Sequence, residues 1–184
     1  MRRYILPGLV AVAAVALLAL LAFGVGGQNA GSSIDAQIAK GDYPIAPSLR
    51  AALPMLGSSA RTSLAAYHGQ VVVVNVYASW CGPCQAEAPI LANAEQSLRA
   101  HGATVLGITY LDDPAASARF VRQQHITYPV LRDVGGDFVR SFGTNGVPET
   151  FVINRQGRVQ ALRRFQLDDT WLKTVLPPIL AEHS

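Results

Sequence analysis

The chain has 184 residues and a formal net charge of +3 at neutral pH; half of its residues are hydrophobic and 15% are charged. This length suits one domain of ordinary size with a short extension, and such a domain buries a sufficient core without disulfide cross-links. No lysine- or arginine-rich run occurs, and Arg2 and Arg3 supply two of the net charges, so the composition argues against a nucleic-acid partner.

An uncharged apolar segment follows these arginines. Residues 5–25 read ILPGLVAVAAVALLALLAFGV, and as a helix they would extend about 31 Å, enough to cross a hydrocarbon core of about 30 Å. No charge follows until Asp35. The positive-inside rule therefore predicts a single-pass transmembrane anchor, with residues 1–4 as a cytoplasmic stub and the rest of the chain on the extracytoplasmic (periplasmic or outer) face.

A cleaved signal peptide is the alternative interpretation of this segment. The apolar region of a signal peptide usually spans about 7 to 15 residues and ends in a small-x-small site. The segment here is longer, and Gln28 stands where the nearest candidate site needs a small residue. The pattern favours an uncleaved anchor, and either interpretation exports the remainder of the chain.

Residues 26–44 are predicted as a linker. They begin with GGQNAGSS, whose small polar residues are typical of flexible linkers. The following SIDAQIAKGDYP fits either one helical turn or disorder. The folded domain is predicted over residues 45–184.

The first half of this domain alternates strand and helix signals. Two short candidate strands, LRAAL and TSL, flank the turn residues PMLGSSAR. GQVVVVNVYAS is a continuous β-branched run without alternation, as in a central strand covered on both faces. QAEAPILANAEQSLRAHG has helical periodicity and contains Pro89.

The second half adds a strand, two helices, a hairpin and a closing helix. ATVLGITY is a buried strand, DDPAASARFVRQQH starts a helix with aspartate and proline, and GGDFVRSFG is a short helix. ETFVIN and RVQALRRF flank a hairpin turn, and DDTWLKTVLPPILAEH is a helix predicted to break or bend at Pro177 and Pro178. This order predicts a mixed-sheet α/β domain with helices on both faces.

The two cysteines of the chain, Cys81 and Cys84, stand in SWCGPC. A structural zinc site needs four ligands, and none of the four histidines has a paired spacing. A covalently attached haem needs a histidine where Gln85 stands. A permanent disulfide over so short a loop would constrain the unfolded chain little. The sequence therefore predicts no metal and no cofactor.

A redox pair accounts for more of the local sequence. Cys81 follows a buried strand and opens a helix, whose dipole and free amides stabilise a thiolate. We therefore expect Cys81 to be the exposed attacking thiol and Cys84, one turn later, to be the shielded resolving thiol. Gly82 leaves room for a partner, Pro83 suits the first helical turn, and Trp80 offers a flat apolar surface.

The stretch VVVVNVYASWCGPCQAEAP resembles the active-site segment of thioredoxin-fold proteins. WCGPC with the following acid and proline resembles the membrane-anchored extracytoplasmic TlpA/ResA/DsbE (CcmG) branch. GITYLDDPAASARFV resembles the extra strand–helix element of that branch, and GVPETFVINRQGRV resembles its cis-proline segment and hairpin. The resemblance covers about residues 45–182, and it implies a thioredoxin-like fold with that strand–helix insertion and thiol–disulfide exchange.

The resemblance also implies roles at matching positions. Pro148 corresponds to the cis-proline that packs against the dithiol, and Val147 would pair with an extended substrate segment. Glu87 lies three residues after Cys84 on the same helix face, where burial would raise the pKa of its carboxyl and allow proton exchange with that cysteine. Glu149 would tune the site or contact a partner, or simply begin a strand.

One position departs from cytoplasmic thioredoxins. They carry a buried aspartate six residues before the first cysteine, where this chain has Asn75. An asparagine cannot shuttle a proton, which leaves Glu87 as the candidate acid.

The function implied by the resemblance is that of a reductase in cytochrome c maturation. It would act on apocytochrome c or other exported protein thiols, fed by a membrane thiol–disulfide transporter. An oxidase or isomerase that forms disulfides in secreted proteins stays open, because direction depends on reduction potential. A non-enzymatic copper-binding or copper-site assembly module is a third hypothesis, since two thiolates can hold Cu(I). Peroxidase activity is disfavoured by the close resolving cysteine.

Overall fold

A computed structural model of the protein describes Val15, Leu17, residues 33–144 and residues 146–182. The predicted stub and nearly all of the predicted anchor, residues 5–25, lie outside these described residues. Among the described residues, no helix is both long enough and apolar enough to cross a membrane. The compact unit that carries the cysteines begins at Ile34.

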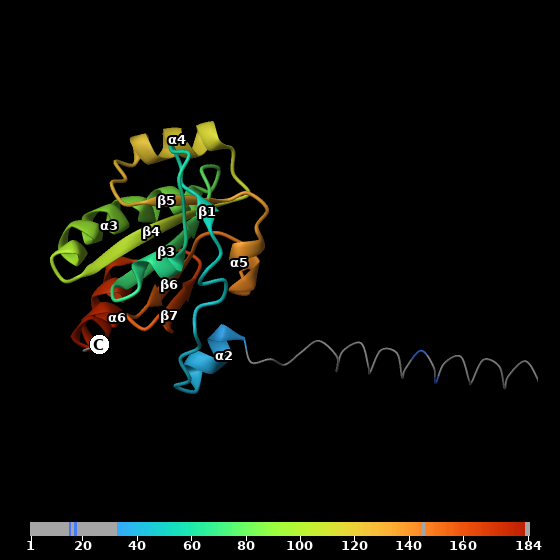
Figure 1. The fold of residues 1–184 in the computed structure, drawn as a ribbon, viewed down its shortest axis with the longest axis vertical. Coiled ribbons are helices and arrows are strands. Elements are labelled where there is room, and N and C mark those ends of the chain that lie inside the picture. The colour runs from blue at the N-terminus through green and yellow to red at the C-terminus, as the bar shows by residue number, and fades with distance from the viewer. Residues whose placement is uncertain (1–14, 16, 18–32, 145, 183–184) are drawn as a thin grey trace, which may run out of the picture. The chain divides into compact units, whose positions relative to one another are not determined.

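A mixed five-stranded sheet forms the centre of the described unit, with strand order β5-β4-β3-β6-β7 (Figure 1). β3 pairs in parallel with β4 and β4 in parallel with β5, whereas β6 and β7 are antiparallel to their neighbours. The strands are β3 (Val71–Tyr77), β4 (Ala103–Tyr110), β5 (Val130–Asp133), β6 (Glu149–Ile153) and β7 (Val159–Arg164). The predicted mixed α/β sheet is confirmed.

The central strand β3 is buried along its whole length. Its valines suit a pleated strand with apolar layers on both sides. Val72 and Val74 contribute to one core cluster, and Val71 and Val73 contribute to the other. By the same alternation Asn75 lies on the face of Val71 and Val73, so a polar side chain points into an apolar layer.

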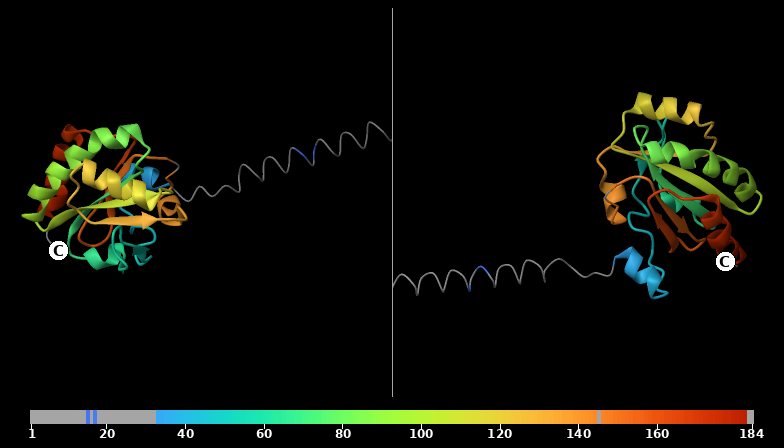
Figure 2. Two further views of the ribbon diagram at one scale, coloured as in Figure 1. Left: turned by 90° about the horizontal axis from the view of Figure 1, so that it is seen from above. Right: turned by 180° about the vertical axis from the view of Figure 1, so that it is seen from behind.

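Helices cover both faces of the sheet, as predicted (Figure 2). The core cluster containing Val71 includes residues of α3 (Gly82–Arg99) and α6 (Asp169–Ala181). The cluster on the opposite face includes residues of α5 (Asp137–Ser141) and of the 3-10 helix η1 (Leu64–Tyr67).

α4 (Pro114–Gln123) connects β4 to β5. Asp113 caps its first turn by accepting from the Ala116 N–H at 2.8 Å. Its Phe120 ring stacks on Tyr77 with ring centroids 5.0 Å apart. This helix therefore packs against the end of β3 that leads to the cysteines.

A buried carboxylate ties α3 to β4. Glu95 is 1% exposed, and it accepts from the Val105 N–H at 2.5 Å and from the Thr104 hydroxyl at 3.0 Å. The Arg99 guanidinium donates to the same carboxylate at 2.6 Å. These contacts orient α3, whose first turn carries the cysteines.

Three elements differ from those predicted. The chain forms β5, which was not predicted, because its four residues pair in parallel along the outer edge of β4. In place of the strands predicted over LRAAL and TSL, the chain forms a short antiparallel hairpin with two residues in each strand, β1 (Leu53–Pro54) and β2 (Arg61–Thr62). The predicted break at Pro177 and Pro178 does not occur, since α6 continues as one helix through both prolines; they lie on its exposed side, and Leu176 and Ile179 beside them are buried.

The predicted linker contains a helix, α2 (Ile34–Ala39). Ile34 is 9% exposed and belongs to the same core cluster as Val72 and Val74. The helix also contacts β7. The folded unit therefore includes Ile34–Ala39, which the composition placed in the linker.

Candidate active site

The two cysteines form a disulfide with their Cα atoms 5.3 Å apart. Cys81 is the N-cap residue of α3, and its sulfur accepts from the Cys84 N–H at 3.2 Å. Pro83 lies in the first turn, where a missing N–H leaves no helical bond unmade. The predicted strand–cysteine–helix arrangement is confirmed.

The expectation that Cys81 is exposed is wrong for this disulfide-bonded state. Cys81 is 5% exposed and Cys84 is 1% exposed, and both belong to the core cluster on the α3 side of the sheet. The exposed groups are their neighbours: Trp80 is 64% exposed, and Gly82 and Pro83 are exposed as well. A Cβ at Gly82 would meet nothing within 4 Å, so the approach to the disulfide is open there.

Glu87 is a buried carboxyl behind the disulfide, 1% exposed and one turn after Cys84. Its Oε1 accepts from the Asn75 side-chain amide at 2.7 Å, and its Oε2 accepts from the Leu167 N–H at 3.0 Å. Burial raises the pKa of Glu87 from 4.5 to about 7, against the opposing effect of these two donors. The predicted direction of this pKa change is confirmed.

Asn75 joins this carboxyl to the strand that follows Pro148. Its amide also donates to the Thr150 hydroxyl at 3.1 Å. The sequence excluded Asn75 as a proton carrier but did not identify it as the donor that holds Glu87. The alternation of β3 could have placed Asn75 on the α3 face, but only the packed helix shows which acid it meets.

The Val147–Pro148 peptide bond is cis, as expected. Pro148 is buried, whereas Val147 is half-buried and packs against both core clusters. A cavity of about 420 Å³ adjoins these two residues. It is also lined by Asp35, Gly143, Gly146, Glu149, Arg164 and Phe165.

Glu149 begins β6 and is 8% exposed. Its Oε2 accepts from the Thr144 hydroxyl at 2.6 Å and from the Arg164 guanidinium. Arg164 also donates to Asp35 of α2, at 2.6 Å from Nη2 and 3.1 Å from Nε. The sequence did not indicate that Asp35 and Arg164 belong to this site, because no local pattern links residues that are 129 positions apart.

Replacing Asp35 with asparagine is expected to loosen α2. The change removes the negative charge that pairs with Arg164. Because both side chains are partly exposed, this ion pair contributes about 1 kcal/mol to stability. Unfolding by urea should begin at a lower concentration, and limited proteolysis should cut near residues 33–45 sooner. Asp42→Asn, an exposed carboxylate in the same segment, is the matched control and should leave both unchanged.

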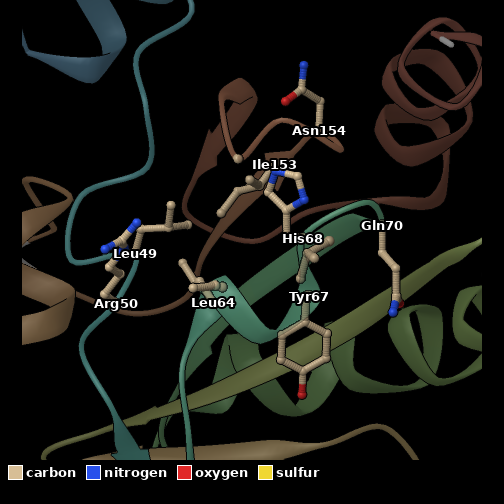
Figure 3. Close-up of a pocket in the computed structure, with 11 residues that line it drawn as sticks. Leu49, Arg50, Leu64, Tyr67, His68, Gln70, Ile153 and Asn154 are labelled. Carbon is tan, nitrogen blue, oxygen red and sulfur yellow. The ribbon is translucent and has the colours of Figure 1, made fainter. Parts of the chain in front are cut away.

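A second cavity, of about 220 Å³, lies elsewhere in the fold (Figure 3). Its lining includes Gln70 and Val72 at the first end of β3. Cys81 follows the other end of this seven-residue strand, about 20 Å further along. This cavity is therefore separate from the disulfide site.

No group of three or more His, Cys, Asp or Glu side chains placed to hold a metal ion occurs in the described part of the chain. The arrangement that the structure brings together is thus a disulfide at a helix N-terminus, a buried acid behind it and a cis-proline segment with an adjoining cavity.

Comparisons with known proteins find thiol:disulfide proteins among those that are similar to this chain. The chain is 33% identical over 109 residues to the thiol:disulfide interchange protein DsbE of Pseudomonas fluorescens biotype C, covering 59% of each chain. It is 27% identical over 93 residues to the thiol-disulfide oxidoreductase ResA of Bacillus thuringiensis subsp. konkukian, covering 50% of this chain and 54% of that protein. The chain thus spans less than two thirds of the length of these curated relatives.

Among solved structures, a secreted thiol-disulfide isomerase from Corynebacterium glutamicum superposes with a TM-score of 0.69 at 25% identity. The superposition covers 78% of this chain and 89% of that one. The model of the AhpC/TSA family matches residues 46–162, which is more than half of the chain. This protein therefore belongs to the thioredoxin-like AhpC/TSA family.

Proposed function

We propose that this protein is an extracytoplasmic thiol–disulfide oxidoreductase. The observation that carries the proposal is the Cys81–Cys84 disulfide at the start of α3, with the buried Glu87 carboxyl one turn behind it. A dithiol at a helix N-terminus favours a thiolate, and the thiolate is the species that attacks disulfides.

The reaction runs in two exchanges. The Cys81 thiolate attacks a substrate disulfide, forms a mixed disulfide and releases one substrate thiolate. Cys84 then attacks the Cys81 sulfur, which releases the second substrate thiolate and forms the Cys81–Cys84 disulfide. Glu87 accepts the proton of Cys84, which its pKa of about 7 permits near neutral pH.

The surroundings of the disulfide supply the substrate site in this proposal. The exposed Trp80, with Gly82 and Pro83, meets the substrate on the helix side. Val147 pairs with an extended substrate segment beside Pro148. Glu149, which lines the cavity of about 420 Å³, contacts the substrate or tunes the reactivity of the site.

We infer the direction to be reduction, with apocytochrome c cysteines or other exported protein thiols as substrate. The GVPETFVIN segment, which resembles that of the cytochrome-maturation subgroup of the TlpA/ResA/DsbE branch, supports this choice. The name of the DsbE relative supports thiol–disulfide interchange as the reaction. The electrons would come from a membrane thiol–disulfide transporter. Residues 5–25, as a transmembrane anchor, would hold the domain near that donor on the extracytoplasmic side of the cell membrane.

The reduction potential of the full chain, titrated against glutathione or dithiothreitol, tests this direction. A value near or below about −230 mV, in the thioredoxin range, is expected for a reductase fed from across the membrane. A value near about −120 mV, in the range of strong oxidants, would instead assign disulfide formation to the protein.

An oxidase or isomerase for secreted proteins is the second candidate, favoured by the name of the Corynebacterium glutamicum structure. Refolding of a reduced or scrambled multi-disulfide protein separates it from a reductase. A copper-binding module is the non-enzymatic alternative. Titration of the reduced protein with Cu(I) would favour it only if a tight complex formed and exchange with glutathione were absent.

A further inference from the structure

Asp112 follows β4, and its carboxylate accepts three hydrogen bonds. The Ser79 N–H donates to Oδ2 at 2.8 Å and the Ser79 hydroxyl donates to Oδ1 at 2.7 Å. The Ser117 hydroxyl, from α4, donates to Oδ2 at 2.7 Å. This half-buried carboxylate thus accepts from both donors of Ser79 and links Ser79 to α4 through Ser117.

Ser79 lies between β3 and α3, two residues before Cys81. The Cys81 N–H donates to the Ala78 carbonyl at 3.1 Å, which closes a tight turn over this stretch. Ala78 and Cys81 at the ends of this stretch are buried, whereas Trp80 between them is 64% exposed, so packing does not hold the middle of the turn. Asp112 is therefore the side chain that anchors the entry of the turn that presents Cys81.

The backbone before Asp112 has an uncommon conformation. Leu111 has a φ of 48° and a side chain that is 51% exposed. A leucine in the left-handed region costs free energy, because its Cβ crowds the following carbonyl. The three hydrogen bonds of the next residue offset this cost, so the loop conformation and the contact to Ser79 belong together.

The charge of Asp112 also reaches the end of β3. Burial first, and the Asp112 charge second, raise the pKa of Tyr77, two residues before Ser79. The Tyr77 hydroxyl is buried with no hydrogen-bond partner among the described residues. Asp112 therefore lies close to the end of β3 as well as to Ser79.

We propose that Asp112 is a positioning residue for thiol–disulfide exchange, which holds the Ser79–Cys81 turn so that the Cys81 sulfur stays at the start of α3 within reach of Cys84. The proposal rests on the proposed function. Nothing in the sequence around Asp112 marks it for this role, because its partner Ser79 is 33 residues away. The adjacent Asp113 is the residue that caps α4.

Asp112→Ala tests the proposal in the full chain in detergent solution. It removes all three hydrogen bonds, and a loosened turn disfavours the disulfide more than the dithiol, which needs no fixed sulfur separation. The equilibrium constant with glutathione is expected to shift toward the dithiol by about tenfold, or about 30 mV. The rate of exchange with a disulfide substrate should fall as well.

Two further variants separate position from charge. Asp112→Asn keeps an oxygen that accepts from the Ser79 N–H and removes the charge, so it should restore most of the wild-type equilibrium constant. Ser79→Ala keeps the charge and removes one hydrogen bond, so it should shift the constant in the same direction as Asp112→Ala but less. Ser79→Ala also tests the proposal if Asp112→Ala fails to fold.

Asp113→Ala is the matched control. It removes a neighbouring carboxylate of equal charge that accepts from Ala116 rather than from Ser79. It should destabilise α4 without moving the redox equilibrium. Any of three results would overturn the proposal. The control could shift the equilibrium constant with glutathione as much as Asp112→Ala does. The constant could stay unchanged in both Asp112→Ala and Ser79→Ala, or Asp112→Asn could have the same effect as Asp112→Ala.

The failure of this inference is distinguishable from that of the proposed function. If wild-type protein exchanges with glutathione normally while the Asp112 and Ser79 variants match it, only the positioning role is lost. If the wild-type disulfide does not exchange at all, the proposed function fails first.

Discussion

Replacing Cys81 with serine is expected to abolish thiol–disulfide exchange. Cys81 is the N-cap of α3 and the nucleophile of the proposed reaction, and a hydroxyl at this position does not attack a disulfide. The loss should reach the background rate in an assay of insulin or glutathione-disulfide reduction. Full activity in this variant would refute the proposed mechanism.

Cys84→Ser is the matched variant, because it keeps the attacking thiol and removes the resolving one. Cys84 is the more buried of the two, at 1% exposed. The variant should accumulate mixed disulfides with its substrates, which non-reducing electrophoresis detects and mass spectrometry identifies. Capture of an apocytochrome c would support the reductase assignment, and capture of unrelated secreted proteins would support the oxidase or isomerase.

Replacing Glu87 with glutamine is expected to slow exchange about 100-fold at neutral pH, because the proposed proton acceptor for Cys84 is lost. Since the pKa of Glu87 is about 7, the wild-type rate should rise with pH through that region. The variant should lose this rise. Stopped-flow rates from pH 5 to 9 measure it, and an unchanged rate and profile would remove Glu87 from the mechanism.

The same carboxyl predicts a pH dependence of stability. Its pKa is raised in the folded state, so between pH 4.5 and about 7 the unfolded chain releases this proton while the folded protein keeps it. The free energy of unfolding should therefore fall as pH rises through this window, by an amount on the order of 3 kcal/mol. Glu87→Gln should lack this slope.

Glu95→Gln is the matched control for both measurements. Glu95 is a second buried glutamate of α3, about 12 Å further along the helix, and its partners are in β4 and α3 rather than in the site. The change should lower stability, because buried donors lose a charged acceptor. It should leave the pH profile of exchange unchanged.

The sequence by itself determined the elements of the site that are local. A run of valines predicts β3, and the helix that follows places Cys81 at its N-terminus. Spacing alone places Glu87 one turn after Cys84 on α3. These features depend on neighbouring residues, so local patterns were sufficient to predict them.

The tertiary structure alone decided which distant residues meet. Asn75 reaches Glu87 and Thr150, 75 residues away, because β3 pairs with β6 in one register and α3 packs over that face. Asp112 meets Ser79 because β4 lies beside β3 in parallel, so both strands end at the same edge of the sheet.

The same limit explains the parts of the fold that local patterns did not predict. α2 joins the folded unit through Asp35 and Arg164, which are 129 residues apart. β5 gains its strand conformation from the edge of β4 rather than from a strong pattern of its own. Strand register and helix packing are cooperative properties of the whole chain, and no window of local sequence contains them.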